Sequence, residues 1–461
     1  MDADELGLLS GRLATELGAQ LDERLAGIAP AHAWGVFAGG ELVRVHGSGN
    51  AAERPASTAF RIASCTKSFT AAATLLLAEE GSLDLDEPLA DALDVPLTLI
   101  GPAGPPPTVR DALAMRAGFP TDDPWADRQE SLSDDDFGRL LTRGVRLARP
   151  AGSGYEYSNL GYAIVGRILA LRAGMPYLRL VETRLLGPLG LTGTGFDRAV
   201  PHPITGYRPG PDGWEALPFS APGAFSPIGG LFSTVTDLAR WCGVLSGAID
   251  TEALPHGLVE RMRHPQTPVL GDVAGSGPWQ AYGLGLVVRA DGAGRHFIGH
   301  SGGYPGFTTR MEWEQSSRVG AVVFENATYT SLTPVVHAAF AAAFGSPDAA
   351  PAAPLRPAVV PWPEAVAAAE RLRTALAAGS LGEAALLDPC VDLDVPLERR
   401  RARLAELLTA IGGVIELGAI EHETPAQAAW ELHGPRGVLR CRILLTPVAE
   451  PRVQKLDVTL G

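Results

Sequence analysis

Ser64 and Lys67 are the residues whose types and spacing best fit nucleophilic catalysis. They lie three residues apart, just before an alanine- and leucine-rich stretch that predicts a helix over residues 69–80. One helical turn places the Lys67 amine on the same face as the Ser64 hydroxyl, within hydrogen-bond reach. The free backbone N–H groups of a helix N-terminus also suit a developing oxyanion. The spacing therefore predicts a serine nucleophile beside its base.

The use of lysine in this chain supports a catalytic Lys67. Of the 38 basic residues, only Lys67 and Lys455 are lysines, and the others are arginines. Arginine keeps its proton in a protein, whereas a lysine amine can lose its proton once burial or a nearby cation lowers the pKa. At its ordinary pKa, only about one lysine in 2,500 is neutral at pH 7. Lys67 therefore needs a lowered pKa if it is the base.

Two further segments supply groups that could complete a site. Tyr157-Ser158-Asn159 opens a predicted helix over residues 157–172, and it contains one of only three asparagines. His300-Ser301-Gly302-Gly303 follows a predicted strand over residues 295–298, and its glycines permit close backbone approach. The ordinary pKa of a tyrosine phenol, about 10, also lies well above pH 7, so Tyr157 too would need a lowered pKa to act as the base. Either group, or the coupled pair, could take the Ser64 proton.

In this order, Ser64-x-x-Lys67, Tyr157-Ser158-Asn159 and His300-Ser301-Gly302 resemble the three motifs of the serine β-lactamase and penicillin-binding-protein superfamily. The closest resemblance is to its class C branch, with its esterases and D-amino peptidases, and it spans roughly residues 10 to 345. It implies an α/β (α+β) fold in which helices flank an antiparallel sheet, with an all-helical lobe and the site in the cleft between them. It also implies a covalent acyl-enzyme on Ser64 that water later releases.

The resemblance also implies roles for individual residues. Asn159 would orient Lys67 and the substrate amide, and the backbone N–H groups of Ser64 and Gly303 would form the oxyanion hole. No cofactor and no metal is expected. The predicted catalytic residues are Ser64, Lys67 and Tyr157, and the predicted substrate-binding and oxyanion residues are Asn159, His300, Ser301, Gly302 and Gly303.

The residue at position 300 bears on the substrate. Penicillin-active members of the superfamily usually place a lysine there, and its permanent charge attracts the substrate carboxylate. A histidine is mostly neutral at pH 7, so the attraction should be weaker. We therefore predict an esterase that acts on small esters or amides. The alternatives are a β-lactamase, a D-amino-acid peptidase or acyltransferase of the same family, or a non-catalytic binding protein that retains the fold.

Composition and charge limit the partners and the location. The chain has 461 residues, 46% of them hydrophobic, and its formal net charge is −14, which disfavours nucleic acid and anionic membrane surfaces. The acidic start over residues 1–5 lacks the positive charge of a signal peptide, and the longest apolar run, over residues 71–78, is too short to span a bilayer. We predict a cytoplasmic protein that acts on a small-molecule acyl substrate, with free thiols at its four cysteines.

The remaining patterns predict the domain organisation. A helix over residues 6–28, a hairpin over residues 32–46 and strands over residues 295–325 predict one sheet closed by the two ends of this region. The acidic segment 122–136 and the arginines at 399–401 are expected to be solvated. The predicted parts are a β-lactamase-like hydrolase domain over residues 1–345, a Pro/Ala-rich linker over 346–362 and a small α+β accessory domain over 363–461 in which nothing indicates chemistry.

Overall fold

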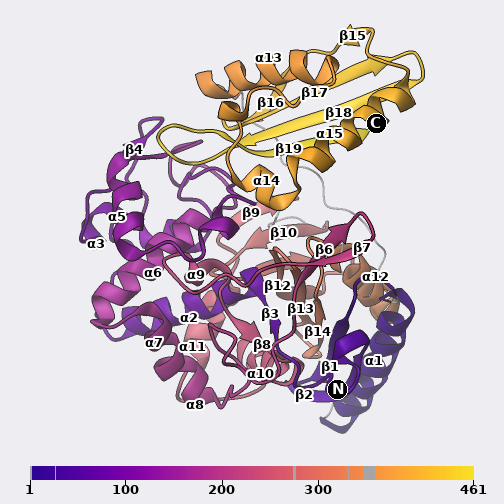
Figure 1. The fold of residues 1–461 in the computed structure, drawn as a ribbon. Helices are drawn as coiled ribbons and strands as arrows, with labels where there is room; N and C mark the ends of the chain where they lie inside the picture. The colour runs from indigo at the N-terminus through magenta and orange to yellow at the C-terminus, as the bar shows by residue number, and fades with distance from the viewer. Residues whose placement is uncertain (1–2, 26, 272, 274–276, 331, 346–358) are drawn as a thin grey trace.

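An antiparallel sheet forms the centre of the molecule (Figure 1). The computed structural model describes residues 3–25, 27–271, 273, 277–330, 332–345 and 359–461. Over these residues the sheet has eight strands in the order β2-β1-β14-β13-β12-β11-β10-β9. Because β1 pairs with β14, strands from the two ends of residues 32–325 lie side by side in one sheet, as the sequence predicts. The strands are β1 (His32–Ala38), β2 (Glu41–Gly47), β9 (Thr267–Leu270), β10 (Trp279–Tyr282), β11 (Val287–Ala290), β12 (His296–Tyr304), β13 (Phe307–Glu314) and β14 (Val319–Glu325).

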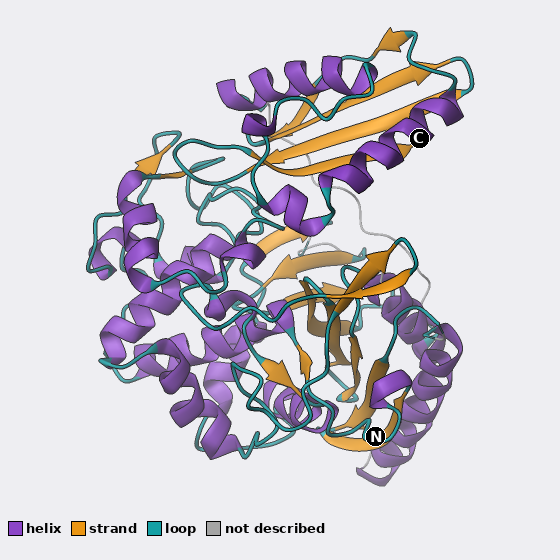
Figure 2. Ribbon diagram, in the orientation of Figure 1, coloured by secondary structure: helices purple, strands orange, loops and turns teal. Residues whose placement is uncertain are grey.

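Helices cover both faces of this sheet, so the predicted fold class is confirmed (Figures 1 and 2). On one face, α1 (Ala3–Arg24) and α12 (Leu332–Phe344) bury Leu17, Trp34 and Phe340 in a separate apolar cluster. Each such side chain stabilises the fold by about 1.5–3 kcal/mol when it leaves water. The other face carries the helical lobe, which consists of α2 (Thr66–Glu79), α3 (Leu89–Ala92), α4 (Val109–Leu113), α5 (Asp134–Arg143), α6 (Asn159–Ala173), α7 (Tyr177–Val181), α8 (Gly187–Leu189), α9 (Ser226–Gly229), α10 (Val235–Ser246) and α11 (His256–Arg263).

Short strand pairs outside the main sheet position the loops around the cleft. β3 (Phe60–Arg61) pairs with β8 (Phe232–Ser233), and a short turn leads from β3 into α2. This pairing fixes the segment that carries Ser64. The other pairs are β4 (Leu99–Ile100) with β5 (Val145–Arg146), and β6 (Tyr207–Gly210) with β7 (Gly213–Ala216).

The C-terminal module, which we define as residues 363–461, has its own sheet and lies across the end of the helical lobe and main sheet (Figure 1). The sheet order is β15-β17-β18-β19, with β16 paired to β17. The helices and strands of the module agree with the expected α+β pattern. The domain boundaries stay predictions, because the linker at 346–362 lies mostly outside the described residues. The elements are α13 (Pro363–Ala377), α14 (Cys390–Asp394), α15 (Leu397–Ile411), β15 (Glu416–Leu417), β16 (Glu421–Thr424), β17 (Gln427–Gly434), β18 (Gly437–Leu445) and β19 (Val453–Leu460).

The acidic segment 122–136 is not solvated along its whole length, so that prediction was wrong in its first half. Asp122, Asp127 and Glu130 are buried, whereas residues 134–136 are exposed at the start of α5. The buried carboxylates have polar partners: Glu130 pairs with Arg61 at 3.3 Å and accepts a hydrogen bond from Ser226. Burial of a charged group requires such partners, which are distant in sequence and are not indicated by local composition.

The arginine cluster at 399–401 is only partly a solvated helix face. Arg399 forms an ion pair of 2.7 Å with Glu215 of β7, and Arg400 donates a hydrogen bond of 2.8 Å to the Leu456 carbonyl. Only Arg401 is exposed as expected. All four cysteines are buried free thiols, which confirms that prediction. Within the described residues, we find no helix with the length and apolar character needed to cross a membrane.

Candidate active site

Ser64 lies in a tight turn that connects β3 to α2. The turn is a 3-10 helix over Ala63–Cys65, and Ala63 has a left-handed backbone with φ of 47°. Such a conformation costs of order 1–3 kcal/mol and persists only where the surroundings enforce it. Strand β12 supplies part of that enforcement, because a Cβ at Gly302 would lie 2.3 Å from the Ile62 carbonyl oxygen. Glycine at 302 thus allows the strand to contact the turn that presents the partly exposed Ser64.

Lys67 lies beside Ser64, one helical turn further along the chain. Its Nζ donates hydrogen bonds to Ser64 Oγ at 2.9 Å and to the Ile228 carbonyl of α9 at 2.8 Å. The side chain is fully buried, and this burial lowers the pKa of Lys67 to about 8, although the nearby Asp123, Asp127 and Asp122 act in the opposite direction. At that pKa about one Lys67 in ten is neutral at pH 7, compared with about one in 2,500 for an unperturbed lysine.

Tyr157, two residues before the start of α6, lies beside these two residues. Lys67 Nζ lies 5.1 Å from the centroid of the Tyr157 ring. Burial, followed by the charge of Asp123, holds the pKa of Tyr157 well above its ordinary value, and a hydrogen bond with Ser64 acts against this rise. The phenol therefore keeps its proton. Of the two candidate bases that the sequence leaves open, Lys67 is the better suited to accept the proton of Ser64.

Asn159 has different partners from those that the family resemblance implies. Its Nδ2 donates to Asp122 Oδ1 at 3.0 Å and to Asp123 Oδ1 at 2.5 Å, and no hydrogen bond joins it to Lys67 within the described residues. The two carboxylate acceptors fix the orientation of the amide, because only its nitrogen can donate. Asn159 Oδ1 is buried and has no hydrogen-bond partner among the described residues.

Asp122 explains why the Tyr157–Asn159 segment is held in place. Its carboxylate accepts hydrogen bonds of 2.8 Å from the backbone N–H groups of Asn159 and Leu160, the first residues of α6. This satisfies two donors that a helix N-terminus otherwise leaves unpaired. Burial and the charge of Asp123 raise the pKa of Asp122 to about 7.

His300 is buried, and both of its ring nitrogens have protein partners. Nδ1 bonds the Ser301 carbonyl, which can only accept, so Nδ1 carries the hydrogen. Nε2 then accepts from the Tyr282 hydroxyl at 2.9 Å. Burial, with a further contribution from Lys67, lowers the pKa of His300 to about 3. The imidazole is therefore neutral, and its nitrogens are not free to bind a substrate carboxylate.

The backbone N–H groups predicted to form an oxyanion hole belong to the Ser64 turn and to β12. Among the described turn, loop and cap hydrogen bonds, none runs from the Ser64 N–H to a backbone carbonyl. Gly303 follows the contact between β12 and the turn, and a Cβ there would lie 3.1 Å from the ring of Tyr329. Ser301 and Gly303 are both half-buried. The role of these N–H groups is a proposal that we develop below.

Sequence analysis missed three residues that interact with this site or with each other beside it. Asp123 and Asp127 lie in the segment expected to be solvated, and Tyr329 follows β14. The Tyr329 hydroxyl donates to Asp127 Oδ2 at 3.0 Å. This hydrogen bond connects the segment after β14 to the segment that carries Asp127. A left-handed φ of 46° at Tyr329 marks an unusual backbone, but this feature is not evident from the sequence.

The C-terminal module contacts the same loop that carries these aspartates. Gln454 of β19 is fully buried, accepts from the backbone N–H of Trp125 at 3.1 Å and donates to the Thr121 carbonyl at 3.2 Å. Arg128 pairs with Asp394 of α14 at 3.1 Å. The module therefore holds both ends of loop 121–128, which its sequence does not indicate.

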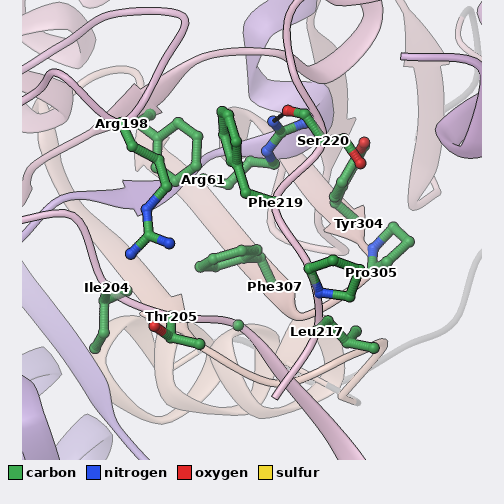
Figure 3. Close-up of a pocket in the computed structure, with 13 residues that line it drawn as sticks. Arg61, Arg198, Ile204, Thr205, Leu217, Phe219, Ser220, Tyr304, Pro305 and Phe307 are labelled. Atoms are coloured by element: carbon green, nitrogen blue, oxygen red, sulfur yellow. Dashed lines mark hydrogen bonds between the residues drawn. The ribbon is translucent and has the colours of Figure 1, made fainter. Parts of the chain in front are cut away.

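Two cavities have walls that include residues close in sequence to the candidate site. A small one of about 20 Å³ is bordered by Arg61, Phe219 and Tyr304, as Figure 3 shows, and the Arg61 guanidinium carbon lies 4.1 Å from the centroid of the Tyr304 ring. A larger one of about 1010 Å³ lies between the helical lobe and the C-terminal module, with Tyr155 and Trp362 in its wall. In the described ranges, no group of three or more side chains has the arrangement of a metal site.

Comparison with known proteins agrees with this geometry. A family model described as Beta-lactamase matches residues 17–345, and this chain therefore belongs to the Beta-lactamase family and is a serine hydrolase. Its sequence is 28% identical over 300 residues to the D-alanyl-D-alanine-carboxypeptidase/endopeptidase AmpH of Escherichia coli (strain K12), a match that covers 60% of this chain and 72% of that protein.

Solved structures share the fold. The octameric penicillin-binding protein homologue from Pyrococcus abyssi has a TM-score of 0.60 at 19% identity and covers 100% of this chain and 99% of its own. The D-amino acid amidase from Ochrobactrum anthropi SV3, complexed with D-phenylalanine, has a TM-score of 0.57 at 25% identity and covers 72% of this chain and 98% of its own. The first of these extends through the C-terminal module, so the whole arrangement of the chain has a structural counterpart.

Proposed function

We propose that this chain hydrolyses small esters or amides through an acyl-enzyme on Ser64. The observation that carries this proposal is the hydrogen bond of 2.9 Å between Lys67 Nζ and Ser64 Oγ, formed by an amine whose burial lowers its pKa. A nucleophile and a base in hydrogen-bond contact are the minimum that acyl transfer to serine requires.

The proposed reaction has two stages. In the first, neutral Lys67 takes the Ser64 proton while Oγ attacks the substrate carbonyl, and the backbone N–H groups of Ser64 and Gly303 stabilise the oxyanion. The lysine ammonium then returns that proton to the departing alcohol or amine, which leaves Ser64 acylated. In the second stage water attacks the ester, the acid is released, and Ser64 regains its proton. Tyr157 remains protonated and orients Ser64.

The site favours esters and uncharged amides over penicillins. Anionic substrates need a cation near the nucleophile, and the neutral His300 does not supply one. The names of AmpH and the D-amino acid amidase support peptides or amides of D-amino acids as the second candidate. We also propose that the chain does not bind nucleic acid, because its net charge is −14. A cytoplasmic location stays a proposal.

A labelling experiment tests the proposed function. The native chain should react with a fluorophosphonate probe and hydrolyse p-nitrophenyl acetate, and Ser64→Ala should abolish both. Ser82→Ala, at an exposed serine after α2, is the matched control and should keep both activities. Absence of Ser64-dependent labelling would favour the alternative of a non-catalytic binding protein, and rapid nitrocefin turnover without ester hydrolysis would favour a β-lactamase.

A further inference from the structure

Met115 lies in a strained turn just after α4. Its backbone has a left-handed φ of 55°, and its side chain is only 2% exposed. A residue with a Cβ rarely adopts this conformation, and it persists only where neighbouring contacts enforce it. On one side, Thr267 Oγ1 of β9 donates a hydrogen bond of 2.8 Å to the Ala114 carbonyl. On the other side, Arg116 pairs with Asp111 of α4 at 2.7 Å. The turn therefore holds Met115 in one place.

Met115 accepts a hydrogen bond on each side of Tyr157. Its carbonyl oxygen accepts from the Glu156 N–H at 2.9 Å, and its Sδ accepts from the Ser158 N–H at 3.3 Å. Glu156 and Ser158 are both buried, and buried N–H groups need such partners. Because the two donors belong to the immediate neighbours of Tyr157, these hydrogen bonds fix the backbone from which its phenol projects.

The Ser158 N–H depends on a sulfur acceptor. A thioether sulfur is a weak hydrogen-bond acceptor compared with a carbonyl or carboxylate oxygen. Among the described turn, loop and cap hydrogen bonds, however, none runs from the Ser158 N–H to a backbone carbonyl. The next two N–H groups, those of Asn159 and Leu160, bond the Asp122 carboxylate. A hydrocarbon side chain at position 115 would therefore remove the acceptor of the Ser158 N–H.

The placement of Tyr157 matters because its phenol contacts the nucleophile. The Tyr157 hydroxyl shares a hydrogen bond with Ser64, and Lys67 Nζ lies 5.1 Å from the centroid of the Tyr157 ring. In the proposed reaction this phenol keeps its proton and orients Ser64. Such orientation is sensitive to small displacements, since a shift of about 1 Å can cost about a hundredfold in rate. A residue that fixes the Tyr157 backbone therefore affects the nucleophile indirectly.

We propose that Met115 is a positioning residue for acyl transfer to Ser64, and that it acts through Tyr157. Its carbonyl and its sulfur hold the two peptide groups beside Tyr157, and the strained turn after α4 holds Met115. This inference rests on the proposed hydrolase function and adds a residue to the machinery of that same site. The sulfur serves only as a hydrogen-bond acceptor, so no proton or electron passes through it.

Met115→Leu tests the sulfur contact. Leucine has a similar volume and is apolar, but it cannot accept a hydrogen bond from the Ser158 N–H. We expect kcat/KM for p-nitrophenyl acetate and the rate of fluorophosphonate labelling of Ser64 to fall by about tenfold. Met262→Leu makes the same change at a fully buried methionine of α11. It is the matched control and should keep both quantities within about twofold of their native values.

A second background separates positioning through Tyr157 from general support of the fold. In Tyr157→Phe the hydroxyl that orients Ser64 is already absent, so adding Met115→Leu should lower kcat/KM by less than about twofold further. An equal loss of about tenfold in both backgrounds would show that Met115 only supports the fold, and would overturn the proposal. Urea unfolding of each variant confirms that the proteins compared are folded.

Norleucine provides a test that does not depend on how well leucine packs. It replaces the sulfur by a methylene and keeps the shape of the side chain, and the chain has five methionines at which it can be incorporated. We expect the norleucine protein to lose about tenfold in kcat/KM, and Met115→Leu in that protein to lose less than about twofold more. Native activity in the norleucine protein would overturn the role of the sulfur.

The outcomes distinguish this inference from the proposed function. Native hydrolysis of p-nitrophenyl acetate that is lost in Ser64→Ala, together with a native rate in Met115→Leu, would overturn the role of Met115 and leave the hydrolase intact. Absence of Ser64-dependent hydrolysis and labelling in the native chain would overturn the proposed function itself.

Discussion

Lys67 is the residue on which the proposed chemistry depends, because its amine would have to be neutral to accept a proton from Ser64. Lys67→Arg keeps the positive charge but removes the ability to deprotonate at accessible pH. We expect it to lower the rate of Ser64 labelling by about 10²–10⁴-fold, the usual contribution of a general base. Lys455→Arg, the same change at the exposed second lysine, is the control and should leave the rate unchanged. A Lys67→Arg rate within tenfold of the native rate would contradict the assignment.

The pH dependence should report the same group. Burial lowers the pKa of Lys67 to about 8, and the reactive form is the deprotonated one that exists above this pKa. We therefore expect kcat/KM for an uncharged ester to rise about tenfold per pH unit below pH 8 and to level off above it. Tyr157→Phe should lower the rate but keep this midpoint, because the pKa of Tyr157 lies well above its ordinary value. A midpoint that moves in Tyr157→Phe would identify the phenol as part of the titrating pair.

For individual residues, the sequence predicts the proposed reacting groups but not the side chains that contact them. Ser64 and Lys67 follow from a spacing of one helical turn, and Tyr157 follows from a recognisable motif. The partners of Asn159 do not follow, because Asp122 and Asp123 approach it from a separate loop. Local composition made that loop appear solvated, whereas its burial depends on tertiary contacts.

The contact between β12 and the nucleophile turn is the feature at the element scale that most directly positions Ser64. Gly302→Ala would place a Cβ 2.3 Å from the Ile62 carbonyl oxygen, so strand and turn must separate. We expect Ser64 labelling to slow by at least about tenfold and the free energy of unfolding to fall by about 1–3 kcal/mol, the usual cost of overpacking.

A glycine in open space is the control for this variant. A Cβ at Gly257 of α11 meets nothing within 4 Å, and alanine there improves helix propensity by up to about 1 kcal/mol. Gly257→Ala should therefore keep the labelling rate, and the stability measured by urea unfolding should stay the same or rise. If Gly302→Ala also kept both, β12 would not hold the turn in place.

Element prediction succeeded where the hydrophobic period was clear. The N-terminal hairpin, α2 and α6 lie within a few residues of their expected positions. Strand β12 was expected over residues 295–298 but runs over His296–Tyr304. Its second half was not predicted because glycines interrupt the alternation of apolar and polar side chains there. The pair β3 and β8 was not predicted, since two residues are too few to show a period.

At the scale of the whole molecule, the C-terminal module is connected to the cleft rather than separate from it. The sequence indicates a small α+β unit without chemistry, and its docking was not predictable because every contact joins residues far apart in the chain. Gln454 lies between Thr121 and Trp125, which flank Asp122 and Asp123. The module therefore supports the loop that carries Asp122 and Asp123, which accept hydrogen bonds from the Asn159 amide.

Gln454→Ala tests this support in the full-length chain. It leaves the Trp125 N–H and the Thr121 carbonyl without their partner, and each buried group left unsatisfied costs about 1–3 kcal/mol. Because loop 121–128, which carries the acceptors of the Asn159 amide, then loses a fixed position, we expect kcat/KM for p-nitrophenyl acetate to fall by about fivefold, while Ser64 labelling continues. Gln20→Ala, at a solvent-exposed contact in α1, is the matched control and should leave both unchanged. A Gln454→Ala protein with native kcat/KM would show that the module docks against the loop without influencing the site.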